Sequence, residues 1–225
     1  MIETLEPYRI VDLSKKVVPG EGDRRCEIRP IKNERSDDYY CELDLMTHLG
    51  THLEAPYHFD LKWKDIAAFP ASAFMGRCVM LKITDIEPGA RIMPEHLDSA
   101  DGGRVRKGDI VIVETPYHLP PFSFPDPDKE IRPHVNSDMG QWLVDKGIKC
   151  IGFADSVDIE TRISDFQDFH RVAMGKDITF IEVLENLDEL KADVFFLISL
   201  PMYIVGMDSC PVRVVAIEGI PGFDK

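Results

Sequence analysis

The sequence predicts a strand-rich α/β fold in a single domain that spans residues 1–225. Short apolar runs of strand length far outnumber segments with helical spacing. The chain is 44% hydrophobic and 29% charged, the composition of a globular protein large enough to bury a core without disulfides. No linker divides the chain. We therefore expect one domain built on a mixed β-sheet or a β/β/α arrangement, with fewer helices than strands.

Eight segments have the local patterns of β-strands. Two of them alternate apolar and polar residues, which is typical of half-buried strands, and they can pair through the polar turn between them. These two are Cys26–Ile31 and Tyr39–Leu45. The other six are short apolar runs, typical of buried strands. They are Arg9–Leu13, Cys78–Ile83, Asp109–Glu114, Lys149–Phe153, Val194–Leu200 and Val212–Ile217.

One helix and one long loop complete the prediction. Asp138–Lys146 places apolar residues at helical spacing, and Gly147 follows as a C-cap, so we expect a helix that leads into the strand at Cys150. The segment Pro116–Pro133 contains six prolines, which exclude a helix or a central strand. It is expected to be a loop, either a lid or interface arm or an ordered surface loop.

Charge and cysteine content limit the partners and the compartment. The chain carries 26 basic and 40 acidic residues and a net charge of −14, which repels nucleic acid and anionic membrane surfaces. Five cysteines without a CxxC pair indicate reduced thiols, most of them in the core. No apolar segment reaches the roughly 20 residues of a membrane helix, and no leader precedes the first strand. A cytoplasmic location is expected.

Three of the seven histidines, His48, His52 and His58, lie within eleven residues and enclose Glu54. Imidazole and carboxylate groups together bind divalent ions such as zinc or manganese. The alternative is that these histidines are structural, with their hydrogen bonds satisfied inside the fold. Glycine and proline interrupt the segment, so a straight helix is a poor description and a bent loop or single turn is expected.

Two further groups lie more than a hundred residues downstream. His170 belongs to the segment Asp168–Arg171, and Glu182 is the acid of the apolar run Phe180–Leu187. A carboxylate in such a run is costly to bury unless a cationic group pairs with it. Both residues are therefore candidates for the same site.

These motifs resemble the cyclase superfamily, a family similar to bacterial kynurenine formamidases and isatin hydrolases. The resemblance is carried by His-x-Gly-Thr-His-x-Glu-Ala-Pro-x-His-Phe at residues 48–59, His-Arg at 170–171 and Ile-Glu-x-Leu-x-Asn-Leu at 181–187. It extends to Asp12–Ser14, Gly108–Ile112, Ser156–Asp158 and Pro211–Ala216, and so covers nearly the whole chain.

The resemblance implies a swivelling β/β/α fold, a homodimer or larger assembly, and a site with one or two divalent ions, Zn²⁺ or Mn²⁺, per subunit. His58 would be the general acid and base, because an imidazole exchanges protons near neutral pH. The implied metal ligands are His48, His52, Glu54, His170 and Glu182, with Glu54 able to serve both ions.

The function implied by this site is hydrolysis of a C–N bond in a small amide, formamide or cyclic amide by metal-activated water. Two alternatives stay open. In a metal-dependent lyase or cyclase, His58 would remove a carbon-bound proton and no water would be consumed. A non-catalytic relative would bind a metal ion or ligand without turnover.

The sequence departs from the family pattern at four places that bear on the site, two of which are the segments Asp155–Asp158 and Asp208–Pro211. Glu54 stands where the family has Asp, which leaves the metal count open. The turn at Val17–Asp23 lacks the aromatic residues that formamidases of the family carry, so N-formylkynurenine is not the expected substrate. Candidates for lining a substrate pocket are Tyr57, Phe59, Trp63, Phe122 and Phe124.

Overall fold

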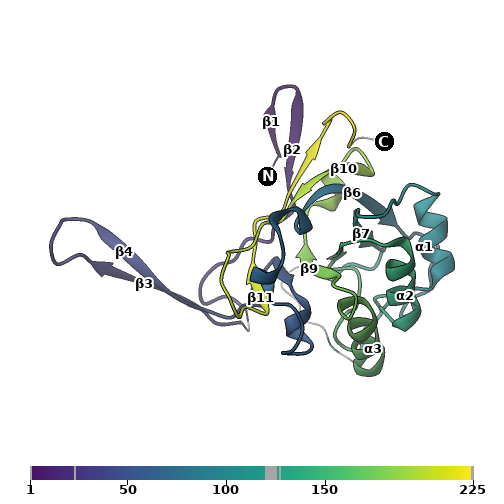
Figure 1. Ribbon diagram of the computed structural model, residues 1–225, viewed down its shortest axis with the longest axis horizontal. Coiled ribbons are helices and arrows are strands. Elements are labelled where there is room, and N and C mark those ends of the chain that lie inside the picture. The colour runs from purple at the N-terminus through teal and green to yellow at the C-terminus, as the bar shows by residue number, and fades with distance from the viewer. Residues whose placement is uncertain (1, 23, 120–125, 127, 224–225) are drawn as a thin grey trace.

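Ten of the twelve strands in the described residues form one curled sheet, and the other two form a hairpin that projects from it (Figure 1). The computed structural model describes residues 2–22, 24–119, 126 and 128–223. The order of strands across the sheet is β1-β2-β12-β10-β6-β7-β8-β9-β5-β11. Their bounds are β1 Ile2–Leu5, β2 Tyr8–Asp12, β5 His52–Glu54, β6 Met75–Lys82, β7 Ile110–Glu114, β8 Cys150–Ala154, β9 Thr179–Leu184, β10 Val194–Ile198, β11 Ser209–Pro211 and β12 Val215–Glu218.

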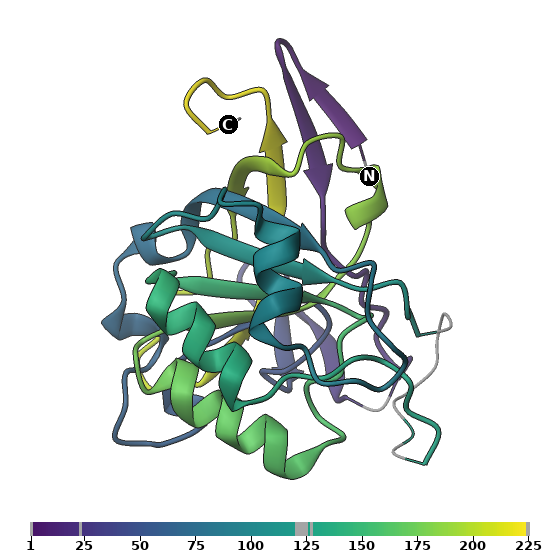
Figure 2. The same cartoon turned by 90° about the vertical axis from the view of Figure 1, so that its right-hand side faces the viewer.

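Strands β6 to β9 form the parallel centre of the sheet, and helices connect them. Parallel neighbours need a crossover, which α1 (Pro94–Asp101), α2 (Ser137–Lys146) and α3 (Ile163–Met174) provide. All three helices lie on one face of the sheet (Figure 2). The flanking strands pair antiparallel, so the sheet is mixed, as the sequence predicts.

The central strands are buried on both faces, because successive side chains point to opposite sides. In β6 and β7, Val79, Leu81 and Val111 pack toward the helices, in one cluster with Leu143 and Phe169. The alternate residues pack into the inside of the curl, against residues of the antiparallel strands. This second cluster includes Cys78, Met80, Ile112, Leu53, Phe195 and Ala216. Continuous apolar runs are what such doubly covered strands require.

The predicted helix is confirmed at α2, and its ends have clear causes. The Asn136 side chain accepts hydrogen bonds from the backbone N–H groups of Asp138 and Met139 at the N-terminus. Gly147 ends the helix in the left-handed conformation, with φ of 68°. Trp142 is buried between these caps and donates to Asp98. The helix therefore delivers the chain to β8 as expected.

The six predicted apolar strands correspond to β2, β6, β7, β8, β10 and β12, with shifted ends. The largest shifts, of three residues, are at β6, which begins at Met75 instead of Cys78, and at β12, which begins at Val215 instead of Val212. Val212 donates its backbone N–H to Thr51, and Val214 donates to the Ser14 side chain, so this stretch leaves the β10 ladder. β1, β5 and β11 were not predicted, because patterns of three or four residues are too short to recognise. β9 (Thr179–Leu184) was not predicted as a strand either, although it overlaps the apolar run that contains Glu182.

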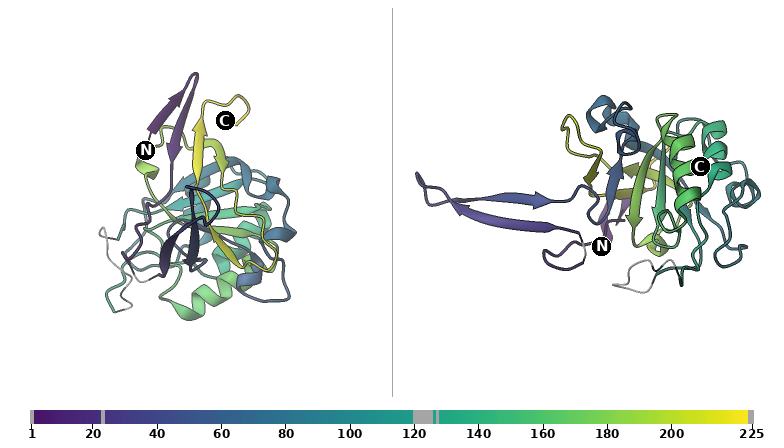
Figure 3. Two further views of the ribbon diagram at one scale, coloured as in Figure 1. Left: turned by 90° about the vertical axis from the view of Figure 1, so that its left-hand side faces the viewer. Right: turned by 90° about the horizontal axis from the view of Figure 1, so that it is seen from below.

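The hairpin of β3 (Cys26–Lys32) and β4 (Tyr39–Leu45) confirms the predicted pairing but not the predicted half-burial. It projects from the body as a separate ribbon (Figures 1 and 3). Within the described residues it pairs with no strand of the large sheet, and Leu43 is 61% exposed. The alternating pattern is present, but the described part of the chain leaves the apolar side of the hairpin exposed.

The proline-rich segment 116–133 contains neither helix nor strand in its described residues, as predicted. Phe122 and Phe124 lie outside the described residues. Arg132 anchors the end of the segment, because its buried guanidinium pairs with Glu130 at 2.7 Å and donates to the Asp155 carbonyl oxygen. Separately, no helix among the described residues has the length and apolar character to cross a membrane.

Candidate metal centre

Strand register brings His52 and Glu182 together from positions 130 residues apart in the chain. They are direct partners across β5 and β9, and His52 Nε2 lies 3.3 Å from Glu182 Oε2. Glu54 follows two positions along β5, on the same face as His52 because the side-chain period of a strand is two. Its Oε1 lies 3.3 Å from the same Nε2 atom.

The bent loop or single turn predicted for this segment is therefore wrong for His52 and Glu54, which lie on a short buried strand. A straight helix is excluded, as predicted. Gly50 makes the turn that precedes the strand, with φ of 59°, a conformation that glycine adopts without strain. A Cβ atom there would collide with the Val17 side chain.

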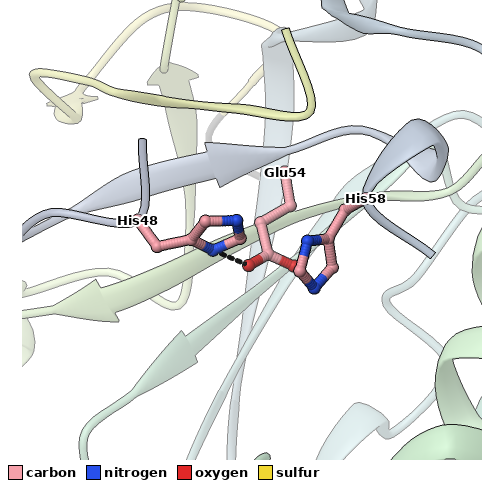
Figure 4. Close-up of side chains that lie close together, drawn as sticks. All are labelled: His48, Glu54 and His58. Atoms are coloured by element: carbon pink, nitrogen blue, oxygen red, sulfur yellow. Dashed lines mark ion pairs between the residues drawn. The ribbon is translucent and has the colours of Figure 1, made fainter. Parts of the chain in front are cut away.

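The Gly50 turn folds His48 back over Glu54. His48 Nδ1 lies 2.6 Å from Glu54 Oε1, so this carboxylate oxygen contacts two imidazoles. Figure 4 shows the Glu54 carboxylate between the rings of His48 and His58. His48 and Glu54 therefore belong to one polar cluster.

His170 approaches Glu54 from α3. Its Nε2 lies 3.9 Å from Glu54 Oε2, and its Nδ1 pairs with the Phe166 carbonyl oxygen one turn earlier at 2.8 Å. The rings of Phe166 and Phe180 pack against the imidazole. His170 is 2% exposed, so it is a buried group with one nitrogen directed at the carboxylate.

His58 differs from the other three histidines because it is accessible. It ends the 3-10 turn Pro56–His58, and its side chain is 31% exposed. Its ring centroid lies 4.5 Å from that of His48 and 6.1 Å from that of His170. His58 therefore lines the open side of the cluster.

Backbone strain lies next to Glu182. Val183 has φ of 59°, an outlier for a β-branched residue. The register between β8 and β9 shifts at Gly152 and Ala154, and Thr51 Oγ1 donates to the Val183 carbonyl oxygen at 2.6 Å. Bulges and strained residues gather next to functional sites, where they redirect side chains. Here the irregular strand carries Glu182 into the cluster.

The electrostatics of the cluster favour a bound cation. Burial raises the pKa of Glu54, but hydrogen bonds from His48 and His52 outweigh burial and hold that pKa well below its usual value. Burial lowers the pKa of His52, but Glu182 and Glu54 outweigh it and raise the pKa to about 10. The carboxylates that hold a proton on His52 would equally attract a metal ion in its place.

The pKa values of His48 and His170 shift in opposite directions. Burial lowers the pKa of His48, but Glu54 and Asp208 reverse the effect and raise it. Burial dominates at His170 and lowers its pKa despite the nearby Glu54 and Glu182. A buried neutral imidazole is the form that binds a metal ion.

Asp208 belongs to a segment in which the sequence departs from the family pattern, but sequence reasoning gave this side chain no role. Its Oδ2 atom lies 2.9 Å from His48 Nε2 and 3.5 Å from His58 Nδ1. Burial raises the pKa of Asp208, but the hydrogen bond and charge of His48 together with hydrogen bonds from Thr47 and Ser209 outweigh burial, so the pKa is lowered. The residue precedes β11, whose pairing with β5 sets Ser209 opposite Glu54. No sequence pattern reveals a three-residue edge strand.

The residues fit a divalent cation. Glu54 Oε2 is buried and has no hydrogen-bond partner among the described residues. An orphaned buried carboxylate oxygen is costly, and a metal ion would satisfy it. Two groups in the described chain have ligand atoms close enough to share an ion: His48, Glu54 and His58, and His52, Glu54 and Glu182. Imidazole and carboxylate ligands suit zinc and manganese.

The aromatic pocket candidates lie beside this cluster. Tyr57 and Trp63 line an open hollow of about 500 Å³, together with Lys64 and Asp177. None of the five converging side chains lines it. The Phe59 ring stacks on Trp63 and also lies 6.1 Å from the His170 ring. Phe59 therefore joins the hollow to the candidate metal centre.

The fold and the site together define a strand-rich α/β protein with a buried histidine–carboxylate cluster whose ligand atoms lie close enough to share a metal ion. Residues 11–161 match the sequence family described as Putative cyclase. The chain belongs to this cyclase family. His170 and Glu182 lie beyond the matched residues.

Curated relatives include a kynurenine formamidase of Bordetella petrii, 32% identical over 179 residues that make up 79% of each chain. A kynurenine formamidase of Bacillus thuringiensis is 27% identical over 205 residues, 88% of each chain. Among solved structures, a potential metal-dependent hydrolase with cyclase activity superposes with a TM-score of 0.76 at 21% identity and covers 95% of this chain and 100% of its own. Isatin hydrolase A from Labrenzia aggregata superposes with a TM-score of 0.73 at 21% identity and 93% coverage of both chains.

Proposed function

We propose that the protein is a metal-dependent amidohydrolase that cleaves a C–N bond in a small amide, formamide or cyclic amide. The observation that carries this proposal is the buried Glu54 carboxylate, which three imidazoles surround and which keeps one oxygen unpartnered among the described residues. The kynurenine formamidase and isatin hydrolase relatives support the same class of reaction. The substrate is proposed to be a small molecule, and assays on a panel of formamides, lactams and cyclic imides would identify its class.

In this proposal His48, His52 and Glu54 hold one cation. Glu54, His170 and Glu182 complete that site or hold a second ion beside it. Glu54 belongs to both groups of ligand atoms that lie close enough to share an ion, which supports a centre of one or two ions, Zn²⁺ or Mn²⁺. One of these groups contains His58, to which the proposal gives the acid–base role instead. When bound, such a cation supplies Lewis acidity, which polarises a carbonyl oxygen and lowers the pKa of water.

His58 is the proposed general acid and base. It is the most exposed imidazole of the cluster, so a substrate and water can reach it. It takes a proton from the attacking water and returns it to the leaving nitrogen, as acid–base catalysis of amide cleavage requires. The buried imidazoles of His52 and His170 instead have one nitrogen fixed by a backbone carbonyl oxygen, which suits ligands and not proton carriers.

The test is an assay of the purified protein, loaded with Zn²⁺ or Mn²⁺, on a panel of aryl formamides, lactams, cyclic imides and isatin. We expect turnover with incorporation of oxygen from labelled water into the product, and its loss on chelation and in His58→Ala. His118→Ala is the matched control, because His118 is an exposed histidine paired with Asp155. Turnover that survives both chelation and His58→Ala would overturn the mechanism, and unlabelled product would indicate a lyase.

N-formylkynurenine belongs on the panel because relatives carry the kynurenine formamidase name. We expect it to be a poorer substrate than smaller formamides, because the turn at residues 17–23 has no aromatic side chain to stack on an aniline ring. Comparison of kcat/KM for the two substrates tests this expectation.

The active form is proposed to be a homodimer. The β3–β4 ribbon exposes Leu43 and Tyr39, and residues 200–205 form a second exposed apolar run that includes Tyr203 and Val205. This run leads into β11, which lies on the side of the body from which the ribbon projects (Figures 1 and 3). A second copy carries both surfaces, so each ribbon can cover the run of the other subunit across a two-fold axis.

The proposed compartment is the cytoplasm. All five cysteines are free thiols, and Cys41 is exposed. Exposed free thiols suit a reducing compartment, where disulfides do not persist. Fractionation of cells that express the protein, followed by immunoblotting, tests this location.

A further inference from the structure

Each buried histidine of the candidate metal centre turns one ring nitrogen away from Glu54 and toward a fixed acceptor. His52 Nδ1 pairs with the Gly50 carbonyl oxygen at 2.8 Å, and His170 Nδ1 pairs with that of Phe166 at 2.8 Å. In both rings Nε2 then faces Glu54. A hydrogen bond at the outer nitrogen fixes the orientation of the ring, so that the inner nitrogen can bind a cation once it gives up its proton.

His48 has the same arrangement with its two nitrogens exchanged. Nδ1 faces Glu54 Oε1 at 2.6 Å, and the outer nitrogen Nε2 lies 2.9 Å from Asp208 Oδ2. A carboxylate accepts only, so Nε2 carries a hydrogen in this pair. Nδ1 donates to Glu54 in the same way here, and it would offer its lone pair to a cation that takes the place of that proton. Asp208 therefore does for His48 what backbone carbonyl groups do for His52 and His170.

The position of Asp208 is fixed by the sheet. Its own carbonyl oxygen accepts a hydrogen bond from the Ala55 backbone at 2.8 Å, immediately after Glu54. The next residue, Ser209, pairs with Glu54 across β11 and β5, and its hydroxyl donates to the Thr47 carbonyl oxygen. The pairing of β5 with β11 thus fixes the proposed ligand Glu54 and also the backbone of Asp208, whose carboxylate hydrogen-bonds to His48.

We propose that Asp208 is a positioning residue of the metal centre, which orients His48 through the Nε2–H···Oδ2 hydrogen bond so that Nδ1 is directed at the cation. This inference rests on the proposed metal-dependent function. The same Oδ2 atom lies 3.5 Å from His58 Nδ1, so one carboxylate sits between a proposed ligand and the proposed proton carrier. The partners of His52 and His170 are backbone carbonyl oxygens, whereas the partner of His48 is the Asp208 side chain, which a substitution can remove.

The test measures metal affinity and not only activity. Purified protein is stripped of metal and titrated with Zn²⁺ against a chromogenic chelator, and its visible spectrum is recorded after loading with Co²⁺. We expect Asp208→Ala to raise the Zn²⁺ Kd about 10- to 100-fold, the usual effect of losing an outer partner of a ligand histidine. The Co²⁺ spectrum should change, because His48 is no longer held in one orientation.

Asp208→Asn keeps an oxygen that can accept from Nε2 and is expected to give a smaller increase in Kd than Asp208→Ala. It also keeps the inference testable if Asp208→Ala lowers the thermal midpoint of the metal-free protein. Asp155→Ala is the matched control, because it removes an equally exposed carboxylate from another histidine pair, Asp155–His118 at 2.7 Å. Its Zn²⁺ Kd should equal that of the parent protein.

A parent-like Zn²⁺ Kd and Co²⁺ spectrum in both Asp208 variants would overturn the positioning role. His48→Ala separates this failure from a failure of the proposed function. If His48→Ala weakens Zn²⁺ binding while both Asp208 variants bind normally, the metal centre stands and Asp208 has no part in it. If His48→Ala also binds Zn²⁺ normally, the proposed centre itself is wrong.

Discussion

His52 Nε2 lies 3.3 Å from Glu54 Oε1, and the two residues occupy alternate positions of one three-residue strand. They are 4% and 2% exposed. The spacing that matters here is thus the two-residue period of a strand, not the four-residue spacing of His48 and His52 that a helix would use. His52 and Glu54 lie on one face of β5, and each of the other proposed ligands, His48, His170 and Glu182, contacts one of these two residues.

Addition of a divalent cation should stabilise the folded protein, because Glu54 Oε2 is buried without a partner among the described residues. Zn²⁺ or Mn²⁺ at a hundred times its Kd contributes about 2.7 kcal/mol. For a chain of this length that raises the thermal midpoint by about 5–10 °C. Differential scanning calorimetry with and without the ion measures the shift. An unchanged midpoint in the parent protein would contradict the proposed centre, and His48→Ala should shift less.

The charge of Glu54 should be needed for metal binding, while its length should not. Glu54→Gln keeps the size of the side chain but removes the carboxylate that the two candidate ligand groups share. We expect it to retain less than one ion per chain after gel filtration. Glu54→Asp keeps a carboxylate and should retain metal. Plasma emission spectrometry measures both contents, and a fully loaded Glu54→Gln protein would refute this role.

Gly50→Ala should both destabilise the fold and weaken metal binding. At φ of 59° an alanine costs about 1–2 kcal/mol, and its Cβ would also collide with Val17. Gly102→Ala is the matched control, since Gly102 has φ of 55° and no atom of the described residues lies within 4 Å of the place its methyl group would take. Urea unfolding should show a larger loss for Gly50→Ala, and only this variant should lose Zn²⁺ affinity. Equal losses of unfolding free energy and of Zn²⁺ affinity in the two variants would mean that the collision with Val17 is relieved without moving His48 and His52.

The sequence was sufficient for the parts of the fold that local patterns specify. The helix at 138–146 and the central strands carry their periodicity and end signals within a few residues. The pairing of His52 with Glu182 depends instead on the register of β5 and β9, which are distant in the chain and partly strained at Val183. Resemblance to a family identified both residues, but it gave no role to Asp208.

Acid and base should both weaken the ion pair that ties α1 to α2. Lys146 Nζ donates to the buried Asp101 carboxylate at 2.6 Å. Burial raises the pKa of Asp101, but the hydrogen bond and charge of Lys146 together with backbone hydrogen bonds from Val105 and Arg104 outweigh burial, so the pKa lies below the unfolded value of 3.8. The Asp101 hydrogen bond raises the pKa of Lys146 above 10.5. The pair thus stabilises the fold fully between these pH values, and the contribution falls as pH drops below 3.8 or rises above 10.5.

Asp101→Asn should therefore lower the free energy of unfolding at pH 7 by about 1–3 kcal/mol, the range for hydrogen bonds to charged groups. The difference from the parent protein should shrink at pH 3, where the parent also begins to lose the charge. Asp98→Asn is the control, because Asp98 is exposed and lies 3.6 Å from Lys146. Urea titrations at both pH values measure the effect, and a difference independent of pH would contradict the ionic origin.

The register of the β3–β4 ribbon gives it one apolar and one charged face. Ile28 pairs with Leu43 across the strands, whereas Arg29 pairs with Glu42 on the opposite side. Cys26 and Leu45 extend the apolar face at the base of the ribbon. An isolated hairpin is marginally stable in water, so an uncovered apolar face of this kind requires a cover. The proposed cover is a second copy of the chain, whose residues 200–205 are apolar and exposed.

Leu43→Asp should convert the proposed dimer into a monomer, because it places a charge in the middle of the apolar face. Glu42→Asp is the matched control on the charged face and should leave the dimer intact. Light scattering during size-exclusion chromatography measures the mass of each variant, and circular dichroism checks that the body stays folded. A monomeric parent protein would mean that the ribbon is bare or covered by another partner, and a dimeric Leu43→Asp protein would place the subunit interface elsewhere. Either result would overturn the proposed use of the ribbon while leaving the metal centre, which lies within one chain, unaffected.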